Sequence, residues 1–201
     1  MAPDLFDHAS SPLKSVFGSA VLHCFSFGEH EEDNVLVIDC LDRSGQDWPP
    51  VRVQSACYTA EIFRSTDCDC HGQLAASLRR VHAEGGLLVY MIADGRGAGL
   101  LTKVRGLSLG ATEGLDTYDA YERLGVDSDP RDYSRVVEVL RYLCVTRLTL
   151  LTNNPRKVAG LESGGIAVQQ EAILIEPTED SLPYLLTKQE KMGHELGLSD
   201  H

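Results

Sequence analysis

The sequence predicts an α/β fold, of the α+β kind, in which helices cover a mixed β-sheet. Leu87 to Ile92 (LLVYMI) is a continuous apolar run that follows a glycine pair, which is typical of a strand buried on both faces. From Leu87 onward such runs alternate with amphipathic segments, as they do when helices cover a sheet. The chain has 201 residues, enough to bury a core. We expect residues 1–12 to be a flexible N-terminus and residues 13–201 to form a single domain.

The first half of that domain is expected to contain strands and one helix. Phe17 to Phe27 and Asn34 to Cys40 are rich in β-branched and aromatic residues and are joined by the turn GEHEED, which predicts an antiparallel pair. A short strand is expected at Val51 to Ser55, after a loop that ends in two prolines. Gln73 to Glu84 places apolar residues at helical spacing, and Gly85-Gly86 would end that helix.

Helices and strands alternate in the second half. The segments between Leu87 and the C-terminus carry either helical spacing of apolar residues or short apolar runs. The expected helices are residues 100–109, 117–124, 133–143, 157–163 and 184–196, and the expected strands are residues 147–151 and 168–175.

Composition excludes several classes of partner. The net charge of −12 and pI near 4.9 argue against a nucleic-acid surface, which needs clustered Lys and Arg. No apolar run is long enough to span a membrane, and Met1 to Ser11 is acidic where a signal peptide would be basic. We therefore expect a cytoplasmic protein with no nucleic-acid or membrane partner.

Three of the six cysteines lie within fourteen residues, in CYTAEIFRSTDCDCH. Such clustering fits reduced thiols and a metal better than a disulfide framework. Thiolates are soft ligands for zinc, and three protein ligands leave the fourth tetrahedral position for a catalytic water. His71 could instead complete a closed structural site. The expected ligands are Cys57, Cys68 and Cys70; Cys24, Cys40 and Cys144 are expected to be small buried hydrophobes.

This segment resembles the zinc motif of GTP cyclohydrolase II, in which a cysteine is followed eleven residues later by CDCG and then QL. That family opens the imidazole ring of GTP at the start of riboflavin synthesis. The resemblance covers residues 13–197 in order, so the chain is identified as a divergent member. The other matching segments are ADGRGAGLLTKVR (residues 93–105), GLDT (114–117), DPRDY (129–133), LLTNNPRKVAGLESGGI (150–166) and TKQEKMGHELG (187–197).

The resemblance implies a zinc-dependent hydrolase that forms a homodimer and takes Mg²⁺ with the nucleotide phosphates. It implies that Asp129 is the proton acceptor and Arg131 a nucleophile toward the α-phosphorus. From the residues alone DPRD would be a surface turn, and an arginine, with a pKa far above neutrality, suits phosphate stabilisation better. The implied nucleotide contacts are Arg52, Gln73, Asp94, Gly95, Arg96, Thr117, Thr152 and Lys157, a set of cations, hydroxyls and an amide that suits a triphosphate and a base.

The chain departs from the family pattern around the base. The family's RxHSEC is RVQSAC here, so Gln54 replaces a histidine and Ala56 replaces a carboxylate that could accept the guanine N–H groups. The remaining departures are Asp67 for arginine, His71 for glycine, Asp94 for glutamate and Leu107 for tyrosine. Two alternatives follow: a ring-opening hydrolase for another base, such as a pyrimidine or modified purine in secondary metabolism, or a non-catalytic nucleotide-binding homologue with structural zinc.

Overall fold

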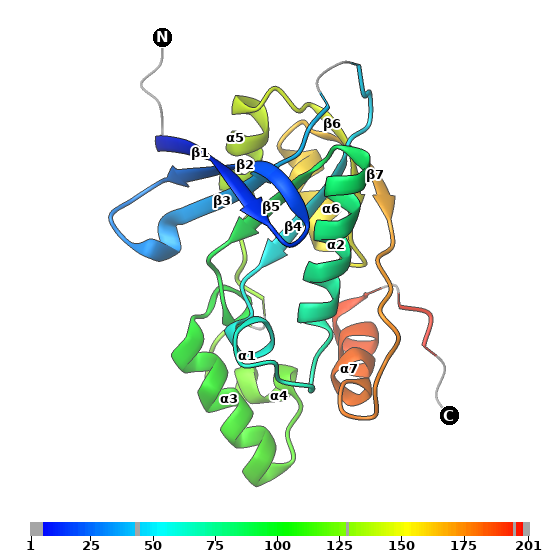
Figure 1. Ribbon diagram of the computed structural model, residues 1–201. Helices are drawn as coiled ribbons and strands as arrows, with labels where there is room; N and C mark the ends of the chain where they lie inside the picture. Colours follow the sequence, from blue (N-terminus) through cyan, green and yellow to red (C-terminus); the bar gives the residue numbers. More distant parts are fainter. Residues whose placement is uncertain (1–5, 43–44, 128, 195, 199–201) are drawn as a thin grey trace. The chain divides into compact units, whose positions relative to one another are not determined.

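The computed structural model describes residues 6–42, 45–127, 129–194 and 196–198, and Figure 1 shows its elements. Contacts group the chain into two compact units. The sheet unit comprises the described residues of Met1–Gln54, Leu74–Ile92 and Asp132–Ile173. The cysteine unit comprises those of Ser55–Gln73, Ala93–Arg131 and Leu174–His201. Both units draw on distant segments, so neither is a contiguous stretch of chain, and a single domain over residues 13–201 stays a prediction.

In the described chain, seven strands of the sheet unit form one mixed sheet in the order β1-β2-β3-β5-β4-β6-β7. Neighbours from β1 through β2 and β3 to β5 run antiparallel, whereas β4, β6 and β7 run parallel. The predicted mixed sheet is therefore confirmed. The strands are β1 (Asp7–Ser15), β2 (Gly18–Ser26), β3 (Asn34–Asp39), β4 (Pro50–Ser55), β5 (Leu87–Met91), β6 (Arg147–Leu151) and β7 (Ala167–Glu171).

The burial of the strands follows their sequence patterns. In β3, every second residue is buried, beginning with Val35 and Val37, because successive side chains of a strand point to opposite faces. β5 is apolar throughout and four of its five residues are buried, as expected for a central strand covered on both faces. Leu148 and Leu150 of β6 are fully buried. Each such side chain contributes about 1.5–3 kcal/mol relative to an exposed one.

The N-terminal expectation is wrong for residues 7–12. They belong to β1, which pairs with β2 from Asp7 opposite Ser26 to Ser15 opposite Gly18. The strand is polar and mostly exposed, with the sequence DHASSPLKS. An edge strand is held by backbone hydrogen bonds along one side and needs few apolar side chains, which is why its sequence resembles a loop. Residues 1–5 of the expected flexible segment lie outside the described residues.

Three helices belong mainly to the sheet unit: α2 (Cys70–Glu84), α5 (Ser134–Tyr142) and α6 (Pro155–Ser163). The right-handed rule for parallel crossovers places α2 on one face of the sheet and α5 with α6 on the other, as Figure 1 shows. α6 begins where Asn154 accepts a hydrogen bond from the Arg156 N–H, with Pro155 in the first turn. At its end, α6 approaches α5 closely: a Cβ on Gly164 would lie 2.4 Å from Val137 Cγ2.

The cysteine unit is built from short helices and loops. Asp116 caps α4 by accepting the Tyr118 and Asp119 N–H groups, and Gly114, with φ of 72°, ends α3. The expected helices are confirmed with boundary shifts of a few residues, whereas α1 was not predicted and β7 is shorter than expected. The helices are α1 (Tyr58–Glu61), α3 (Leu100–Glu113), α4 (Thr117–Arg123) and α7 (Leu182–Met192); 3₁₀ turns are η1 (Glu31–Asp33), in the sheet unit, and η2 (Gly95–Gly97).

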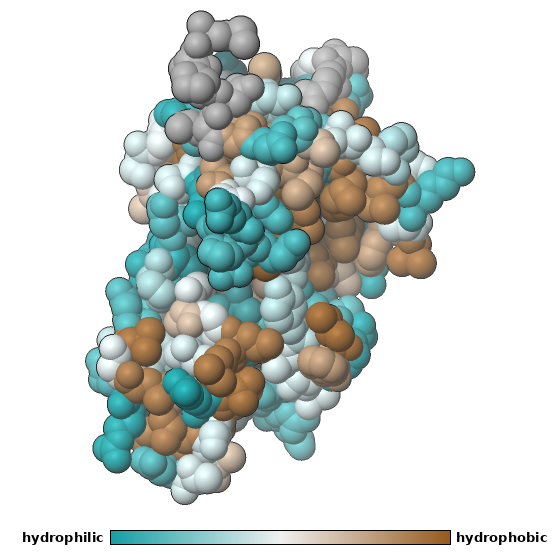
Figure 2. Space-filling view, turned by 90° about the vertical axis from the view of Figure 1, so that its left-hand side faces the viewer, coloured by the Kyte–Doolittle hydropathy of each residue, from teal (hydrophilic) through white to brown (hydrophobic). Residues whose placement is uncertain are grey.

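The surface of the cysteine unit carries exposed apolar side chains. Figure 2 shows hydrophobic atoms gathered on the surface at the level of α3. The exposed residues are Leu100, Leu101 and Val104 on α3 and Ile62 and Phe63 just after α1. Exposed apolar groups in such number mark candidate interaction surfaces. Among the helices described, none combines the length and apolar character needed to cross a membrane.

Candidate active site

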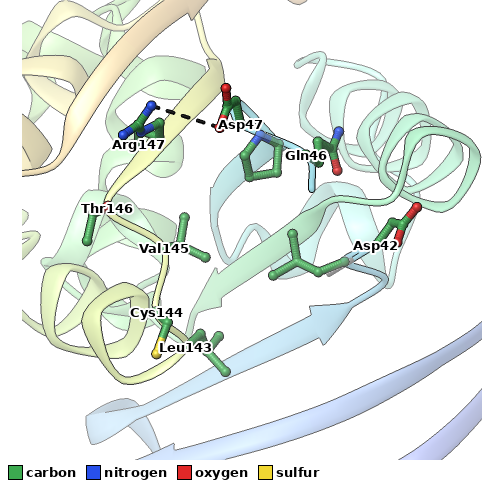
Figure 3. A pocket seen from close by; sticks show the side chains of 10 residues that line it. Asp42, Gln46, Asp47, Leu143, Cys144, Val145, Thr146 and Arg147 are labelled. Atoms are coloured by element: carbon green, nitrogen blue, oxygen red, sulfur yellow. Dashed lines mark ion pairs between the residues drawn. The ribbon is translucent and has the colours of Figure 1, made fainter. Parts of the chain in front are cut away.

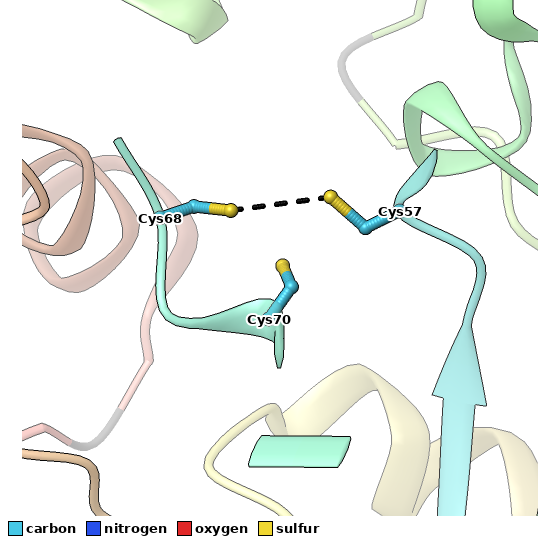
Figure 4. Close-up of side chains that lie close together, drawn as sticks. All are labelled: Cys57, Cys68 and Cys70. Carbon is cyan, nitrogen blue, oxygen red and sulfur yellow. Dashed lines mark hydrogen bonds between the residues drawn. The ribbon is translucent and has the colours of Figure 1, made fainter. Parts of the chain in front are cut away.

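The three predicted metal ligands converge in the cysteine unit. Cys57 precedes α1, Cys68 lies in the bend before α2, and Cys70 is the first residue of α2, so that the sulfur atoms face one another (Figure 4). The Sγ atoms of Cys57 and Cys68 are 3.9 Å apart, and the three sulfurs lie within 4.8 Å of one another. A zinc ion at about 2.3 Å from each sulfur of a tetrahedral site requires separations of roughly 3.8 Å. The donor set and its spacing therefore fit zinc.

The thiols influence one another's protonation. Hydrogen bonds from the Cys68 and Cys70 thiols hold the pKa of Cys57 well below its ordinary value. The hydrogen bond to Cys57 raises the pKa of Cys68 to about 11, and hydrogen bonds to Cys57 and Cys68 raise that of Cys70 far above its ordinary value. One thiolate is thus favoured at Cys57. Zinc binding would displace the remaining protons, because thiol ligands bind metal in the deprotonated form.

His71 does not join the cluster. Its Nδ1 atom lies 3.1 Å from Arg64 Nη1, and among the described residues the cluster that could hold a metal consists of the three cysteines alone. The donors thus leave a fourth position, as in a catalytic zinc site. All six cysteines are free thiols. Cys24 and Cys40 are half-buried, whereas Cys144 is exposed, so the expectation of a buried Cys144 is wrong.

Lys103 of α3 connects Cys57 to Asp94. Its Nζ atom lies 3.2 Å from Cys57 Sγ and 2.9 Å from Asp94 Oδ1. Burial lowers the pKa of the Lys103 ammonium, but the Asp94 hydrogen bond and the charge of Cys57 outweigh it, so the net pKa lies above the ordinary value. The other carboxylate oxygen of Asp94 accepts the Tyr58 N–H at 2.8 Å.

A second lysine lies beside the CxC turn. Lys188 of α7 donates to Asp69 Oδ1 at 3.0 Å, and its ammonium lies 4.3 Å from the centre of the Tyr184 ring. Gln73 donates to the other oxygen of Asp69 at 2.5 Å. Gln73, which is predicted to contact the nucleotide, therefore holds Asp69, the residue between Cys68 and Cys70.

The glycine loop after β5 brings three predicted nucleotide contacts together. Arg96 adopts a left-handed backbone conformation, with φ of 59°, and its Nη2 donates to Thr117 Oγ1 at 3.1 Å. Tyr121 lies beneath the loop: its hydroxyl donates to the Gly95 carbonyl at 3.1 Å, and the Arg96 guanidinium lies 5.6 Å from its ring centre. Gly95, Arg96 and Thr117 thus form one cluster, although Thr117 lies 21 residues after Arg96 in the sequence.

Asp129 and Arg131 form a two-point ion pair. Arg131 Nε and Nη2 each lie 2.6 Å from an oxygen of the Asp129 carboxylate, and Nη1 donates to Ser55 Oγ at 3.4 Å. A Cβ on Gly97 would lie 3.4 Å from Arg131 Cγ, so the pair adjoins the glycine loop. Asp129 and Arg131 therefore lie next to predicted nucleotide contacts within the cysteine unit.

The other predicted contacts, Arg52, Thr152 and Lys157, lie in the sheet unit and are buried. Two nitrogens of Arg52 donate to Gln54 Oε1, at 3.0 and 2.8 Å, and the third to the Leu151 carbonyl at 2.8 Å. Lys157 Nζ donates to the Val53 carbonyl at 2.6 Å. These donors are directed at protein oxygens, and Gln54, the residue in place of the family's histidine, supplies one of them.

Sequence reasoning missed Lys103, Lys188 and Ser55 as members of this arrangement. Lys103 follows GLLT in a segment that does match the family, which is the one signal that could have pointed to it. A pocket elsewhere, in the sheet unit, is lined by residues including Asp42, Asp47, Cys144 and Arg147 (Figure 3). None of the predicted site residues lines it.

The chain is similar to known proteins over most of its length. The model of the family described as GTP cyclohydrolase II matches residues 7–173. GTP cyclohydrolase-2 of Picrophilus torridus is 38% identical over 189 residues, which is 93% of this chain and 97% of that protein. The riboflavin biosynthesis protein RibBA of Staphylococcus epidermidis is 39% identical over 92% of this chain and 47% of its own. RibBA of Bacillus mycoides is 47% identical over 74% of this chain and 38% of its own. This chain thus spans about half the length of the RibBA relatives.

Proposed function

Because the chain belongs to the GTP cyclohydrolase II family, we propose that it is a zinc-dependent hydrolase that opens the imidazole ring of GTP at C8, in riboflavin synthesis. The observation that carries the proposal is the cluster of Cys57, Cys68 and Cys70, whose sulfurs lie within 4.8 Å. Three thiols at tetrahedral spacing with a fourth position left over are the donor set of a catalytic zinc site. Zinc bound there would supply a water of lowered pKa.

We assign nucleotide binding and proton transfer to other residues of the chain. Arg96 and Thr117, which contact each other at 3.1 Å, offer a cation and a hydroxyl to the phosphates or ribose of the nucleotide. Arg131 remains positively charged at neutral pH and, with its fork held by Asp129, offers a positioned cation to a phosphate. Asp129, held against Arg131, is the proposed proton acceptor. Mg²⁺ would accompany the phosphates, as it does in nucleotide-binding enzymes generally.

The test is incubation of zinc-loaded protein with GTP and Mg²⁺, with the ring-opened product followed by mass spectrometry. Formate and pyrophosphate are measured separately in the same samples. Loss of the purine absorbance with appearance of the opened product supports the proposal. Absence of any product, in protein shown to carry zinc, would refute GTP as the substrate.

A second candidate is ring opening of another base, and the observation that favours it is Ala56. This residue stands where the family carries a base-contacting carboxylate, and it is 5% exposed. A methyl group cannot accept the N1 and 2-amino hydrogens of guanine. Turnover of a pyrimidine or modified purine nucleotide, in a panel that includes GTP, would support this candidate over the first.

We also propose that the protein is a cytoplasmic homodimer. The support for the dimer is the apolar surface of the cysteine unit, where Phe63 is 77% and Leu101 65% exposed. Burial of such side chains against a second copy would remove them from water. Light scattering after size exclusion should give twice the chain mass for the native protein and the monomer mass for Leu101→Glu. Leu174→Glu, at another exposed apolar residue of the same unit (62% exposed), is the matched control and should stay dimeric.

A further inference from the structure

We propose that Lys103 is a positioning residue for the zinc ligand Cys57 and that Asp94 holds Lys103 in place. The inference rests on the proposed zinc-dependent function. Lys103 Nζ lies 3.2 Å from Cys57 Sγ and 2.9 Å from Asp94 Oδ1. Both partners are shielded from water, with 15% of the Lys103 side chain and 3% of the Asp94 side chain exposed. The Lys103 ammonium is therefore confined between the Cys57 sulfur and the Asp94 carboxylate.

Asp94 also hydrogen-bonds to the backbone directly after Cys57. Its Oδ2 accepts the N–H of Tyr58, the residue directly after Cys57, at 2.8 Å. Its Oδ1 also accepts the Gly95 N–H at 2.5 Å, which fixes the carboxylate at the start of η2. Cys57 is therefore held at its sulfur by Lys103, and the backbone N–H of the next residue, Tyr58, is held by Asp94. This role for Asp94 differs from the nucleotide contact that the resemblance implies.

The chemistry of the site gives Lys103 a specific effect on the metal. Three thiolates around Zn²⁺ leave the centre with a net negative charge, which a neighbouring ammonium offsets. An N–H···S hydrogen bond also draws electron density from the sulfur, so less is donated to the metal. Outer-sphere partners of this kind orient ligands, and their loss commonly costs about 10- to 100-fold in metal affinity.

Lys188 provides an internal comparison, because it acts on a different atom. Its Nζ donates to the Asp69 carboxylate at 3.0 Å, so it supports the turn that carries Cys68 and Cys70. Loss of Lys188 should weaken zinc binding through the backbone of the turn. Loss of Lys103 should both weaken binding and change the electronic character of the Cys57 sulfur.

The experiment measures zinc affinity by competition with a chromophoric chelator and the sulfur-to-metal charge-transfer band of the Co²⁺-substituted protein. Lys103→Met should bind zinc about 10- to 100-fold more weakly and shift the Co²⁺ band, whereas Lys103→Arg, which keeps an N–H donor, should recover most of both. Lys188→Met, which removes a charge near Cys70 but no hydrogen bond to Cys57, should weaken binding with a smaller shift of the band than Lys103→Met. Arg105→Met, on the exposed part of the same helix, is the matched control and should match the native protein.

Several outcomes would overturn the inference. Native affinity and an unshifted band in folded Lys103→Met would do so, as would a Lys103→Arg variant no better than Lys103→Met. If circular dichroism shows that Lys103→Met is unfolded, Asp94→Asn replaces it as the test variant. This near-isosteric change weakens the interaction between residue 94 and Lys103. Native zinc affinity and an unshifted Co²⁺ band in Asp94→Asn would refute the proposal. Failure of the native protein to bind zinc would instead refute the proposed function, so the two failures are distinguishable.

Discussion

The Arg131 guanidinium and the Asp129 carboxylate face each other in a two-point ion pair, with both N–H···O contacts at 2.6 Å. Only 10% of the Arg131 side chain and 1% of the Asp129 side chain are exposed. Such a fork-to-fork contact fixes the direction of the guanidinium as well as its position. The pair therefore holds a planar guanidinium in a fixed orientation next to the glycine loop. A lysine ammonium, which acts as a point charge, could not reproduce this arrangement.

Arg131→Ala should lower the rate of GTP turnover about 100-fold or more, because a preorganised charge at a phosphoryl group is lost. Arg131→Lys should not restore the rate, since an ammonium lacks the planar fork. Zinc content, measured by metal analysis, should stay at the native level in both variants. A near-native rate in Arg131→Ala would return DPRD to the status of a structural turn.

Arg131→Ala should also destabilise the protein, by roughly 3 kcal/mol, because it removes the two-point partner of a buried carboxylate. The measurement is the free energy of unfolding in urea at pH 7. Arg123→Ala, which removes an arginine whose side chain is 67% exposed, is the control and should change that free energy by less than about 0.5 kcal/mol. Equal small changes in both variants would show that the Asp129 pair contributes little to stability.

Cys68→Ser should remove zinc and activity together, because a hydroxyl is a much poorer ligand for zinc than a thiolate. Metal analysis after gel filtration gives the zinc content directly. Cys144→Ser is the matched control, since Cys144 is exposed and lies outside the cluster; it should keep one zinc per chain. Full zinc occupancy in Cys68→Ser would refute the assignment of the site.

Glu171→Gln should show a pH-dependent loss of stability. Arg80 Nη2 lies 2.7 Å from Glu171 Oε2 and Nη1 bonds the other oxygen, and this hydrogen bonding lowers the pKa of Glu171 from its ordinary 4.5. A lowered carboxyl pKa stabilises the fold above pH 4.5, and the effect is lost as the pH falls through the folded-state pKa. Because 45% of the Glu171 side chain is exposed, we expect about 0.5 kcal/mol at pH 7.

The unfolding free energies of native protein and Glu171→Gln should therefore converge at an acidic pH below the folded-state pKa of Glu171, where the carboxyl group is protonated in both folded and unfolded states. Glu162→Gln, on the exposed surface of α6, should match the native protein at both pH values. A difference at Glu171 that persists unchanged into acid would show that the loss is steric.

GTP should be a slow substrate compared with its turnover by a typical family member, or its reaction should stop at a formylated intermediate. Ala56 cannot accept the guanine donors, and a missing partner for a buried donor costs about 1–3 kcal/mol, or roughly 10- to 100-fold. Leu107 stands where a tyrosine could assist the second hydrolysis. Equal and rapid release of formate, pyrophosphate and opened product would show that both replacements are neutral.

The sequence by itself determined which cysteines cluster and most of the sheet. The spacing of Cys57, Cys68 and Cys70 indicated a shared metal, and the structure brings their sulfurs together. The apolar strands β5 and β6 were also predictable, because continuous apolar runs have few alternatives to burial. These signals are local: each depends on residues that are neighbours in the chain.

The tertiary structure alone decided which residues support those ligands. Lys103 is 46 residues from Cys57, and Lys188 is 119 residues from Asp69, so no local pattern connects either pair. The edge strand β1 was also not predictable from the sequence. Backbone pairing with β2 holds this strand, so its side chains can be polar, like those of a loop. Arg52, predicted to contact the nucleotide, donates to Gln54 and the Leu151 carbonyl, partners that its sequence context did not indicate. A buried charge takes whichever partners the packed chain places around it, and only the folded arrangement specifies them.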